Sequence, residues 1–187
     1  EKLNLHIQKN KHTVLTGPNG SGKSTLIGLA SGNLFPTKGS IVSKTSKIGY
    51  VGSTPLIIKS SLKENILYGN SKNITEDEML KILTNLELYS NPNELDLGQQ
   101  ISNKSLSTGQ MQKISFARAV LGEKELLILD ESTANLDSES KQKIYTLLSG
   151  LEITILNSTH LDLDEMPHDI HLNIDTTKKS NAIVELS

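Results

Sequence analysis

Cysteine and tryptophan are absent from this chain of 187 residues, and aromatic residues make up only 3% of it. Without cysteine the protein has neither a disulfide framework nor a thiolate metal site, an absence that suits a reducing compartment. The shortage of aromatic residues carries no functional prediction. Any chemistry in this chain must therefore come from hydroxyl, carboxylate, imidazole, amine and backbone groups.

Long hydrophobic runs are missing as well. The longest aliphatic run is residues 126–129, whereas a membrane-spanning helix needs about 18–20 apolar residues. No signal-peptide pattern opens the sequence. The formal net charge is −2 and the basic residues are dispersed, which predicts no general attraction to nucleic acid. We expect one soluble domain, residues 1–187, long enough to bury an ordinary core.

A glycine-rich stretch at residues 17–24 has the spacing G-x-x-x-x-G-K-S, which is typical of a nucleoside-triphosphate phosphate loop. Its glycines let successive backbone N–H groups turn toward a phosphate, Lys23 supplies a cation, and the Ser24 hydroxyl is the expected Mg²⁺ ligand. A β-prone run at 13–16 precedes it and a helical pattern at 24–30 follows it, so a chance turn is the weaker interpretation. The predicted phosphate-binding residues are Gly17, Pro18, Asn19, Gly20, Ser21, Gly22, Lys23, Ser24 and Thr25.

Two carboxylates follow the longest aliphatic run. A buried strand at 126–129 would deliver Asp130 and Glu131 to its carboxyl end, where ligands bind in open α/β sheets. There Asp130 would hold Mg²⁺ directly or through water, and Glu131 would orient or deprotonate an attacking water. Taken alone, the pair could equally be a surface acidic pair at the end of a core strand. The phosphate loop elsewhere in the chain favours the metal and water roles.

Short apolar runs alternate with helical patterns, which predicts an α/β fold with a parallel sheet. Strands are expected around 14–15, 48–51, 126–129 and 153–156. One helix should begin after Thr75 with a capping box completed by Glu78, and another should cover 138–149 and end at Gly150. Alternating apolar residues at 170–174 and 182–186 predict a small antiparallel hairpin in the tail.

The stretch Leu106-Ser107-Thr108-Gly109-Gln110 resembles the Leu-Ser-Gly-Gly-Gln signature of the ATP-binding-cassette (ABC) ATPases, and residues 111–121 resemble the signature helix that follows it. Ser107 is a good N-cap, so a helix starting there would present a hydroxyl and free N–H groups to an anion. In isolation, an ordinary capped amphipathic helix would be the better interpretation of this pattern. The resemblance implies that the anion is a γ-phosphate held by an opposing subunit.

Further segments match the same family in order along nearly the whole chain. Residues 132–137 resemble the D-loop that contacts the partner subunit, and residues 158–160 resemble the switch-histidine motif, which makes His160 a catalytic candidate. Residues 35–41 resemble the Pro-Thr-x-Gly turn after the phosphate-loop helix. Residues 61–69 resemble the segment after the Q-loop in exporter-type cassettes.

The chain departs from the family in three places. The Q-loop glutamine should fall at position 53, where the chain has Ser53, and no glutamine occurs between Leu26 and Gly98. The hydroxyl of Ser53 could still reach Mg²⁺ or its water, but it lacks the amide. Thr108 replaces a signature glycine, a mild change. Residues 3–7 look like the strand just ahead of the phosphate loop, but the preceding strand, with its adenine-stacking aromatic, has no counterpart.

The resemblance implies a phosphate-loop NTPase core with an inserted helical subdomain at about 60–122 and a small antiparallel β element. It also implies an ATP- and Mg²⁺-dependent ATPase subunit or domain of an exporter-like ABC transporter at the cytoplasmic face of a membrane. Two cassettes would sandwich ATP, each site combining residues 17–25 of one copy with Ser107, Thr108, Gly109 and Gln110 of the other. A transmembrane permease domain, fused or separate, would be the other partner. The alternative is a degenerate cassette that binds ATP, hydrolyses it weakly or not at all, and acts as a regulatory or scaffolding module.

Overall fold

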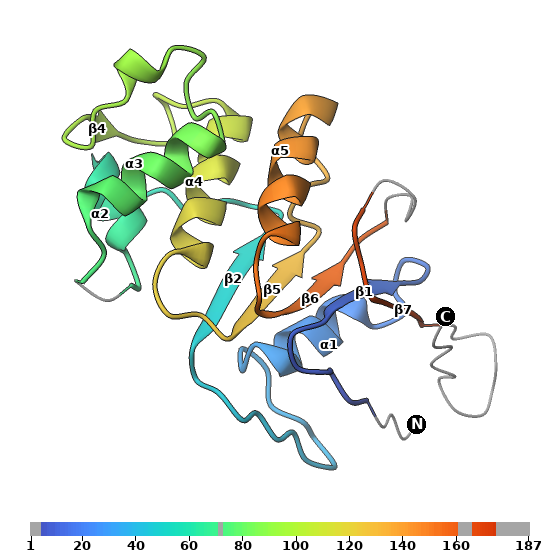
Figure 1. Ribbon diagram of the computed structural model, residues 1–187. Coiled ribbons are helices and arrows are strands. Elements are labelled where there is room, and N and C mark those ends of the chain that lie inside the picture. The colour runs from blue at the N-terminus through green and yellow to red at the C-terminus, as the bar shows by residue number, and fades with distance from the viewer. Residues whose placement is uncertain (1–4, 71–72, 161–165, 175–187) are drawn as a thin grey trace.

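A parallel β-sheet forms the centre of the computed structural model, which describes residues 5–70, 73–160 and 166–174 (Figure 1). Within these residues its five strands lie in the order β2-β5-β6-β1-β7 and all pair in parallel. They span Ile48–Gly52 (β2), Leu126–Asp130 (β5), Thr154–Ser158 (β6), His12–Thr16 (β1) and Ile170–Asn173 (β7). The carboxyl ends of the strands therefore all lie at one edge, where α/β proteins place their ligands.

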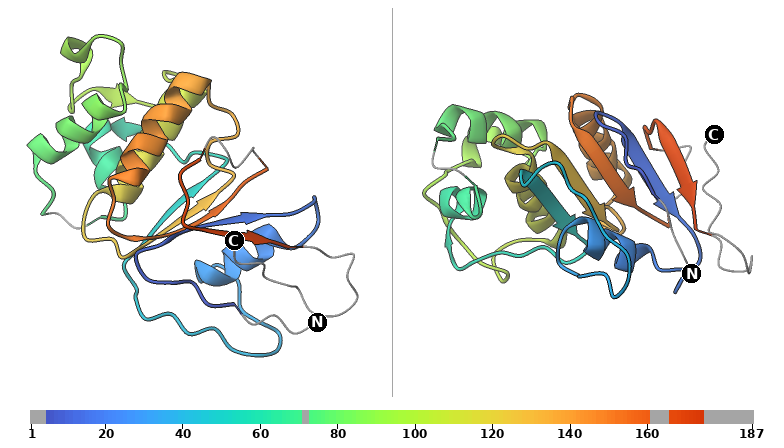
Figure 2. Two further views of the ribbon diagram at one scale, coloured as in Figure 1. Left: turned by 45° about the vertical axis from the view of Figure 1, so that its right-hand side comes forward. Right: turned by 90° about the horizontal axis from the view of Figure 1, so that it is seen from below.

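The sheet is covered on both faces, and the alternation of side chains along β5 shows how. Leu127 and Leu129 join a large apolar cluster with helices α4 and α5, whereas Ile128 joins a second cluster with Ile27 of helix α1. Because successive side chains of a strand point to opposite faces, α1 lies on one face and α4 and α5 on the other (Figure 2). Burial on both faces explains why β5 is a continuous aliphatic run.

Three helices cover the two faces of the sheet. The first, α1, spans Lys23–Ala30 and follows the glycine-rich loop directly, α4 spans Thr108–Val120, and α5 spans Ser138–Ser149. Asp137 caps α5 through its side chain, which accepts a hydrogen bond from the Ser140 backbone N–H, and Gly150 ends the helix.

Residues 60–120 form a group to one side of the sheet, which we call the helical group (Figure 1). It contains α2 (Leu62–Leu67), α3 (Glu76–Asn85), the 3₁₀ turn η1 (Pro92–Glu94) and α4, with a short antiparallel pair of β3 (Ser60–Ser61) and β4 (Gln100–Ile101). Capping boxes start all three α-helices, through Ser61–Glu64, Thr75–Glu78 and Ser107–Gln110.

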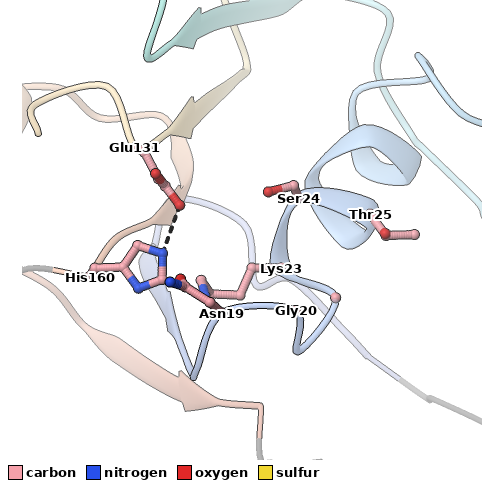
Figure 3. Close-up of a pocket in the computed structure, with 8 residues that line it drawn as sticks. Asn19, Gly20, Lys23, Ser24, Thr25, Glu131 and His160 are labelled. Carbon is pink, nitrogen blue, oxygen red and sulfur yellow. Dashed lines mark ion pairs between the residues drawn. The ribbon is translucent and has the colours of Figure 1, made fainter.

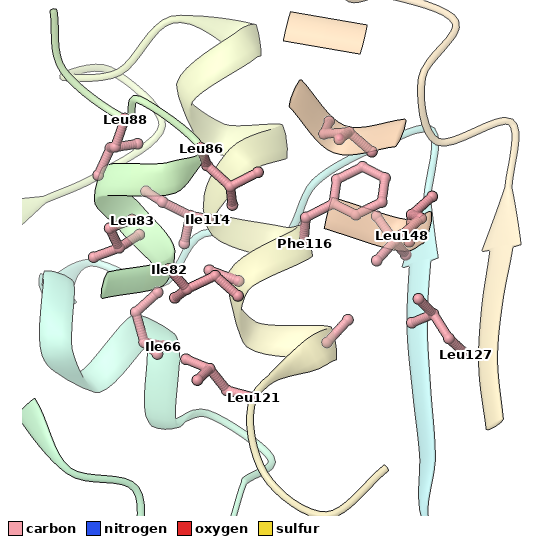
Figure 4. Packing of buried hydrophobic residues seen from close by; sticks show 14 of the residues in the cluster. Ile66, Ile82, Leu83, Leu86, Leu88, Ile114, Phe116, Leu121, Leu127 and Leu148 are labelled. Carbon is pink, nitrogen blue, oxygen red and sulfur yellow. The ribbon is translucent and has the colours of Figure 1, made fainter. Parts of the chain in front are cut away.

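The helical group shares its core with the sheet. Figure 4 shows Ile82, Leu83 and Leu86 of the α3 region packed beside Ile114 of α4, and Phe116 of α4 beside Leu148 of α5. Phe116 and Leu127 are fully buried in the same cluster. The α4 helix is therefore the element that joins the helical group to the sheet.

The predicted α/β fold with a parallel sheet and a small antiparallel element is confirmed. The strands expected near 14–15, 48–51, 126–129 and 153–156 all form, as do the helices after Thr75 and over 138–149. The antiparallel pair that the structure shows is β3–β4. The first arm of the predicted tail hairpin is β7, which pairs in parallel with β1, and the second arm, 182–186, lies outside the described residues.

One local prediction is wrong. Residues 5–7 of the strand expected at 3–7 form no strand, while residues 3 and 4 lie outside the described residues. The side neighbours of β1 are already β6 and β7. Leu5 and Ile7 instead pack, partly buried, against the apolar cluster on the α1 face. Burial of side chains on that face thus takes the place of strand pairing.

A buried histidine opens the strand that leads to the glycine-rich loop. His12 is 8% exposed, and its Nε2 has no hydrogen-bond partner among the described residues. Its backbone N–H donates to Asp169 Oδ2 at 2.8 Å. Desolvation, and then the nearby His168, lower the pKa of His12 from 6.5 to about 4, against the opposing effect of Asp169.

We predict that His12 makes the fold acid-sensitive. The pKa is lower in the folded state, so the unfolded chain binds a proton that the folded chain does not as pH falls from 6.5 toward 4. The loss should approach about 3 kcal/mol in the free energy of unfolding. In denaturant melts at several pH values, the free energy of unfolding of His12→Leu should fall less steeply than that of the parent between pH 6.5 and about 4. Thr13→Val, a matched buried change, should shift the curve without changing its slope; equal slopes for both variants would contradict the assignment.

Candidate functional site

The loop at residues 17–22 leaves β1 in a conformation that requires glycine. Gly17 has a φ of +145°, and a Cβ there would lie 2.6 Å from the Ile174 carbonyl oxygen and 2.9 Å from Ser21 Oγ. Gly22, the N-cap of α1, also has a positive φ, at 100°. Only glycine meets both demands without strain. The loop is therefore compact enough for backbone N–H groups to converge at the start of α1.

Lys23 is folded back over this loop and is almost fully buried. Its Nζ donates hydrogen bonds to the carbonyl oxygens of Gly17 at 2.7 Å and Pro18 at 3.1 Å. The Ser21 hydroxyl inside the loop is buried and has no partner among the described residues. A buried cation and an unsatisfied hydroxyl beside a helix N-terminus fit the phosphates of a nucleotide.

A cavity of about 210 Å³ opens over the loop (Figure 3). Glu131 and His160 face the loop from the other side, with Glu131 Oε1 2.8 Å from His160 Nε2. Both side chains keep more than a third of their surface exposed, so water can reach them. The cavity is lined by Asn19, Gly20, Gly22, Lys23, Ser24, Thr25, Glu131 and His160.

Parallel register brings these residues together. Gly52, Asp130, Ser158, Leu15 and Leu172 are paired in one row across the sheet. The chain leaves the sheet just past this row at every strand, so Glu131, His160 and the glycine-rich loop emerge side by side. More than 100 residues of sequence separate the loop from Glu131 and from His160, and the paired strands bring them together.

Glu131 is held in an unusual backbone conformation. Its φ is +50°, in the left-handed region that residues other than glycine seldom adopt. Its backbone N–H donates to the Ser158 carbonyl at 3.0 Å, which fixes the turn to the end of β6. Strain of this kind costs about 1–3 kcal/mol and is often found where a side chain must be aimed. Here the turn aims the carboxylate at the loop.

Asp130 is held by two hydroxyls and does not line the cavity. Its Oδ1 accepts a hydrogen bond from Ser158 Oγ at 2.7 Å, and its Oδ2 lies 3.5 Å from the Tyr50 hydroxyl. Burial, and then the charge of Asp130, raise the pKa of Tyr50. Sequence reasoning missed both hydroxyls. No sequence signal identifies Ser158 or Tyr50 as partners of Asp130, because both contacts depend on the order and register of the strands.

Ser53, the residue at the expected glutamine position, leaves the sheet beside Glu131. Its side chain is exposed, and it is not among the described residues that line the cavity. A different amide lies nearby: the Gln112 Nε2 of α4 donates to the Gly52 carbonyl at 2.9 Å and to the Ser132 carbonyl at 2.6 Å. Sequence analysis missed Gln112, whose only signal was an amide on the buried face of a helix. It ties the ends of β2 and β5 to α4.

The signature-like residues lie at the start of α4, away from the cavity. Ser107 caps the helix by accepting from the Gln110 backbone N–H, and the Gln110 side chain completes the capping box. Ser107 and Thr108 are exposed, and Gly109 and Gln110 half-buried. Within one copy of the chain these residues do not meet the phosphate loop. Their free helix end faces outward, as a contact with another molecule requires.

The oxygen atoms near the loop and at the end of β5 fit an Mg²⁺ ion that is bound together with a nucleotide. No group of three or more metal-binding side chains is found among the described residues. Mg²⁺ at phosphates usually takes only one or two protein ligands and completes its shell with phosphate oxygens and water. The Ser24 hydroxyl at the cavity and the Asp130 carboxylate at the end of β5 are oxygen donors of the type that Mg²⁺ takes. Within residues 5–70, 73–160 and 166–174, no helix has the length and apolar character needed to cross a membrane.

Comparison with known proteins agrees with this geometry. Residues 1–134 match the family model for the ABC transporter. The chain is 35% identical over 186 residues to the lactococcin-A transport/processing ATP-binding protein LcnC of Lactococcus lactis, covering 90% of this chain and 26% of that protein. It is 37% identical over 180 residues to the ATP-dependent permease MDL1 of Candida albicans, covering 84% of this chain and 26% of the permease.

The fold has a solved counterpart as well. A bacterial Atm1-family ABC exporter with ATP bound superposes with a TM-score of 0.79 at 21% identity, over 92% of this chain and 33% of that one. The chain thus spans about a quarter of the length of the curated relatives it matches. On the strength of the family match, the phosphate loop and the strand order, this chain belongs to the ABC transporter family and corresponds to its ATP-binding domain.

Proposed function

We propose that this chain binds and hydrolyses ATP as the nucleotide-binding subunit or domain of an exporter-like ABC transporter. The observation that carries the proposal is the Glu131–His160 pair, which faces the glycine-rich loop across one cavity. A phosphate loop alone supports nucleotide binding. A carboxylate and an imidazole opposite it supply groups that can place a water for attack on a phosphate.

Binding rests on residues 17–25. Backbone N–H groups of the loop and the N-terminus of α1 would receive the phosphates, and Lys23, already buried beside the loop, would neutralise their charge. Ser24 and Asp130 would hold Mg²⁺, with Ser53 within reach of its hydration water. When bound, Mg²⁺ supplies further charge neutralisation at the phosphate oxygens.

Hydrolysis would depend on Glu131 and His160. The Glu131 carboxylate orients the attacking water and accepts its proton, and His160 holds that carboxylate in place from the end of β6. The turn at Glu131, with its positive φ and its backbone hydrogen bond to Ser158, would hold the carboxylate in this direction. Most of the rate acceleration in such phosphoryl transfers comes from positioning and charge stabilisation.

The assembled site would need a second cassette. We infer a head-to-tail dimer, homo- or heteromeric, in which Ser107, Thr108, Gly109 and Gln110 of one copy contact the γ-phosphate held by the other. The outward-facing start of α4 supports this arrangement. Residues 60–122 would be the helical subdomain of a single cassette covering 1–187. A transmembrane permease domain would be the further partner, with the cassette at the cytoplasmic face of the membrane.

A degenerate cassette that binds ATP as a regulatory or scaffolding module is the second candidate. The exposed Ser53 in place of a glutamine favours it, and the intact Glu131–His160 pair opposes it. Turnover that depends on Glu131 separates the two candidates.

We predict that ATP affinity depends on Lys23. Lys23→Ala removes the buried cation beside the loop and should weaken Mg²⁺·ATP binding by about 2–3 kcal/mol, the scale of a charge-assisted contact. Isothermal calorimetry measures the change. Lys38→Ala, at an exposed position after α1, is the matched control and should bind like the parent. Unchanged affinity in Lys23→Ala would remove the loop from the binding site.

We predict that Glu131→Gln abolishes hydrolysis, keeps ATP bound and traps a dimer. The amide preserves shape but cannot accept the proton of the water, and it lowers the repulsion between two loaded cassettes. Sedimentation velocity with Mg²⁺·ATP and a phosphate-release assay are the measurements. Glu152→Gln, an exposed change far from the cavity, should hydrolyse ATP normally. Undiminished turnover in Glu131→Gln would exclude a catalytic role, and a variant that stays monomeric at high concentration would count against the dimer.

We predict that restoring an amide at position 53 lowers the Mg²⁺ requirement. The Ser53 hydroxyl reaches less far than a glutamine amide, so we expect a water to bridge it to the metal at a cost of roughly 0–2 kcal/mol. Ser53→Gln should therefore reduce the Mg²⁺ concentration needed for half-maximal hydrolysis, and the unmodified chain should turn over slowly. Thr54→Gln places the same amide one residue further on and should leave the Mg²⁺ titration unchanged. Identical titrations for Ser53→Gln and the parent would show that position 53 is not at the metal.

A further inference from the structure

A second polar cavity, of about 460 Å³, lies where the helical group meets α5. Its walls come from three elements far apart in the sequence: the turn after α3, the second turn of α4, and the first turns of α5. The charged side chains that line it are Glu87, Lys113, Asp137, Glu139 and Lys143. None of these residues takes part in the site proposed above. The α5 helix lies beside α4 at this point (Figures 1 and 2).

Glu87 is the residue where the three elements meet. It has a φ of +46°, an uncommon conformation for a side chain of this type, and its backbone N–H donates to Thr84 to close the end of α3. Its carbonyl oxygen accepts a hydrogen bond from Lys113 Nζ of α4 at 2.9 Å. Its carboxylate forms an ion pair with Lys143 of α5. One residue therefore binds α4 through its backbone and α5 through its side chain.

The same turn also holds the first turn of α4. The carbonyl of Leu88, next to Glu87, accepts a hydrogen bond from Gln110 Nε2 at 3.3 Å. Gln110 is the residue that completes the capping box with Ser107. Hydrogen bonds therefore connect the turn after α3 to the first turn of α4. A displacement of Glu87 would displace Ser107 as well.

On α5, the partner of Glu87 is Lys143, which a second ion pair also holds. Lys143 is 21% exposed and also pairs with Glu139 one helical turn earlier, at 2.9 Å. Hydrogen bonds from Lys143 to Glu87 and Glu139 raise its pKa, so it stays charged at neutral pH. Asp137, which caps α5, ends the 132–137 segment that follows Glu131. A shift of α5 against α4 would therefore move that segment relative to Ser107.

We propose that Glu87 is a positioning residue: its ion pair with Lys143 fixes the exposed start of α4 relative to α5 and the 132–137 segment. The two surfaces are then presented together to a second copy of this chain. The inference rests on the proposed ATP-dependent dimer. Partly exposed ion pairs contribute little to folding stability. Orientation is different, because small misplacements of binding groups weaken a contact strongly.

The test compares Glu87→Gln, Lys143→Gln and the double variant, each in the Glu131→Gln background of the 187-residue chain. Sedimentation with Mg²⁺·ATP should show a dimer dissociation constant raised about two- to fivefold in each, while ATP affinity by calorimetry stays unchanged. The double variant should match Lys143→Gln, because that single variant already removes the ion pair with Glu87, together with the one to Glu139. The difference from the parent should shrink as salt is raised to about 1 M.

The matched control is Glu76→Gln. It removes the Lys63–Glu76 ion pair, which is more exposed and joins two helices of the helical group to each other. This variant should dimerise like the parent. Unchanged dimerisation in Glu87→Gln at low salt, or an effect equal to that of Glu76→Gln, would overturn the proposal.

A second measurement does not depend on ATP or on dimer formation. Since the chain lacks cysteine, spin labels can be placed at Asn103→Cys, just before α4, and Gln142→Cys, on the exposed side of α5. The distance distribution between them should broaden or shift in Glu87→Gln and not in Glu76→Gln. If the parent fails to dimerise with ATP, the proposed function fails while this distance still decides whether Glu87 positions α4. Identical distance distributions in the parent, Glu87→Gln and Glu76→Gln would show that Glu87 does not position α4.

Discussion

Parallel pairing of β1, β5 and β6 places three loops at one edge of the sheet, and the proposed chemistry depends on that alignment. The glycine-rich loop follows β1, Glu131 follows β5, and His160 follows β6. A register slip of one residue between β5 and β6 would separate Asp130 from the Ser158 hydroxyl and Glu131 from the Ser158 carbonyl. It would also turn the buried side chains of β5 to the wrong faces. The apolar run that builds the core therefore also sets the geometry of the site.

The charged groups of the site are held by contacts within the protein. Lys23 is buried against the carbonyl oxygens of its own loop, so its cation is in place without the flexibility of an exposed lysine. The Glu131–His160 pair faces it from strands on the other side of the cavity. Preorganised groups of this kind lose little entropy on binding, which is how enzymes make charged groups effective. The positive φ of Glu131 is the local strain that this arrangement requires.

The α4 helix links the site to the surface that would meet a partner. Its buried face carries Gln112, which holds the ends of β2 and β5, and its first turn carries the outward-facing signature residues. Glu87 contacts the same helix through Lys113 and contacts α5 through Lys143. The α4 helix is thus tied both to the chain around the end of β5 and to α5, which begins directly after the 132–137 segment.

By itself, the sequence determined the phosphate loop, the carboxylates after the aliphatic run, the α/β class and the capped helices. These are local patterns, in which residue type and spacing decide the backbone or the chemistry within a few positions. It could not supply the side chains that meet across the sheet or between helices. Ser158 and Tyr50 beside Asp130, and Gln112 beneath Gly52, depend on strand order and register. The strand expected at 3–7 failed for the same reason, because residues 5–7 bury side chains on a face that only the folded sheet creates. The Glu87–Lys143 contact joins positions 56 residues apart, and only the packing of α4 against α5 brings them within reach.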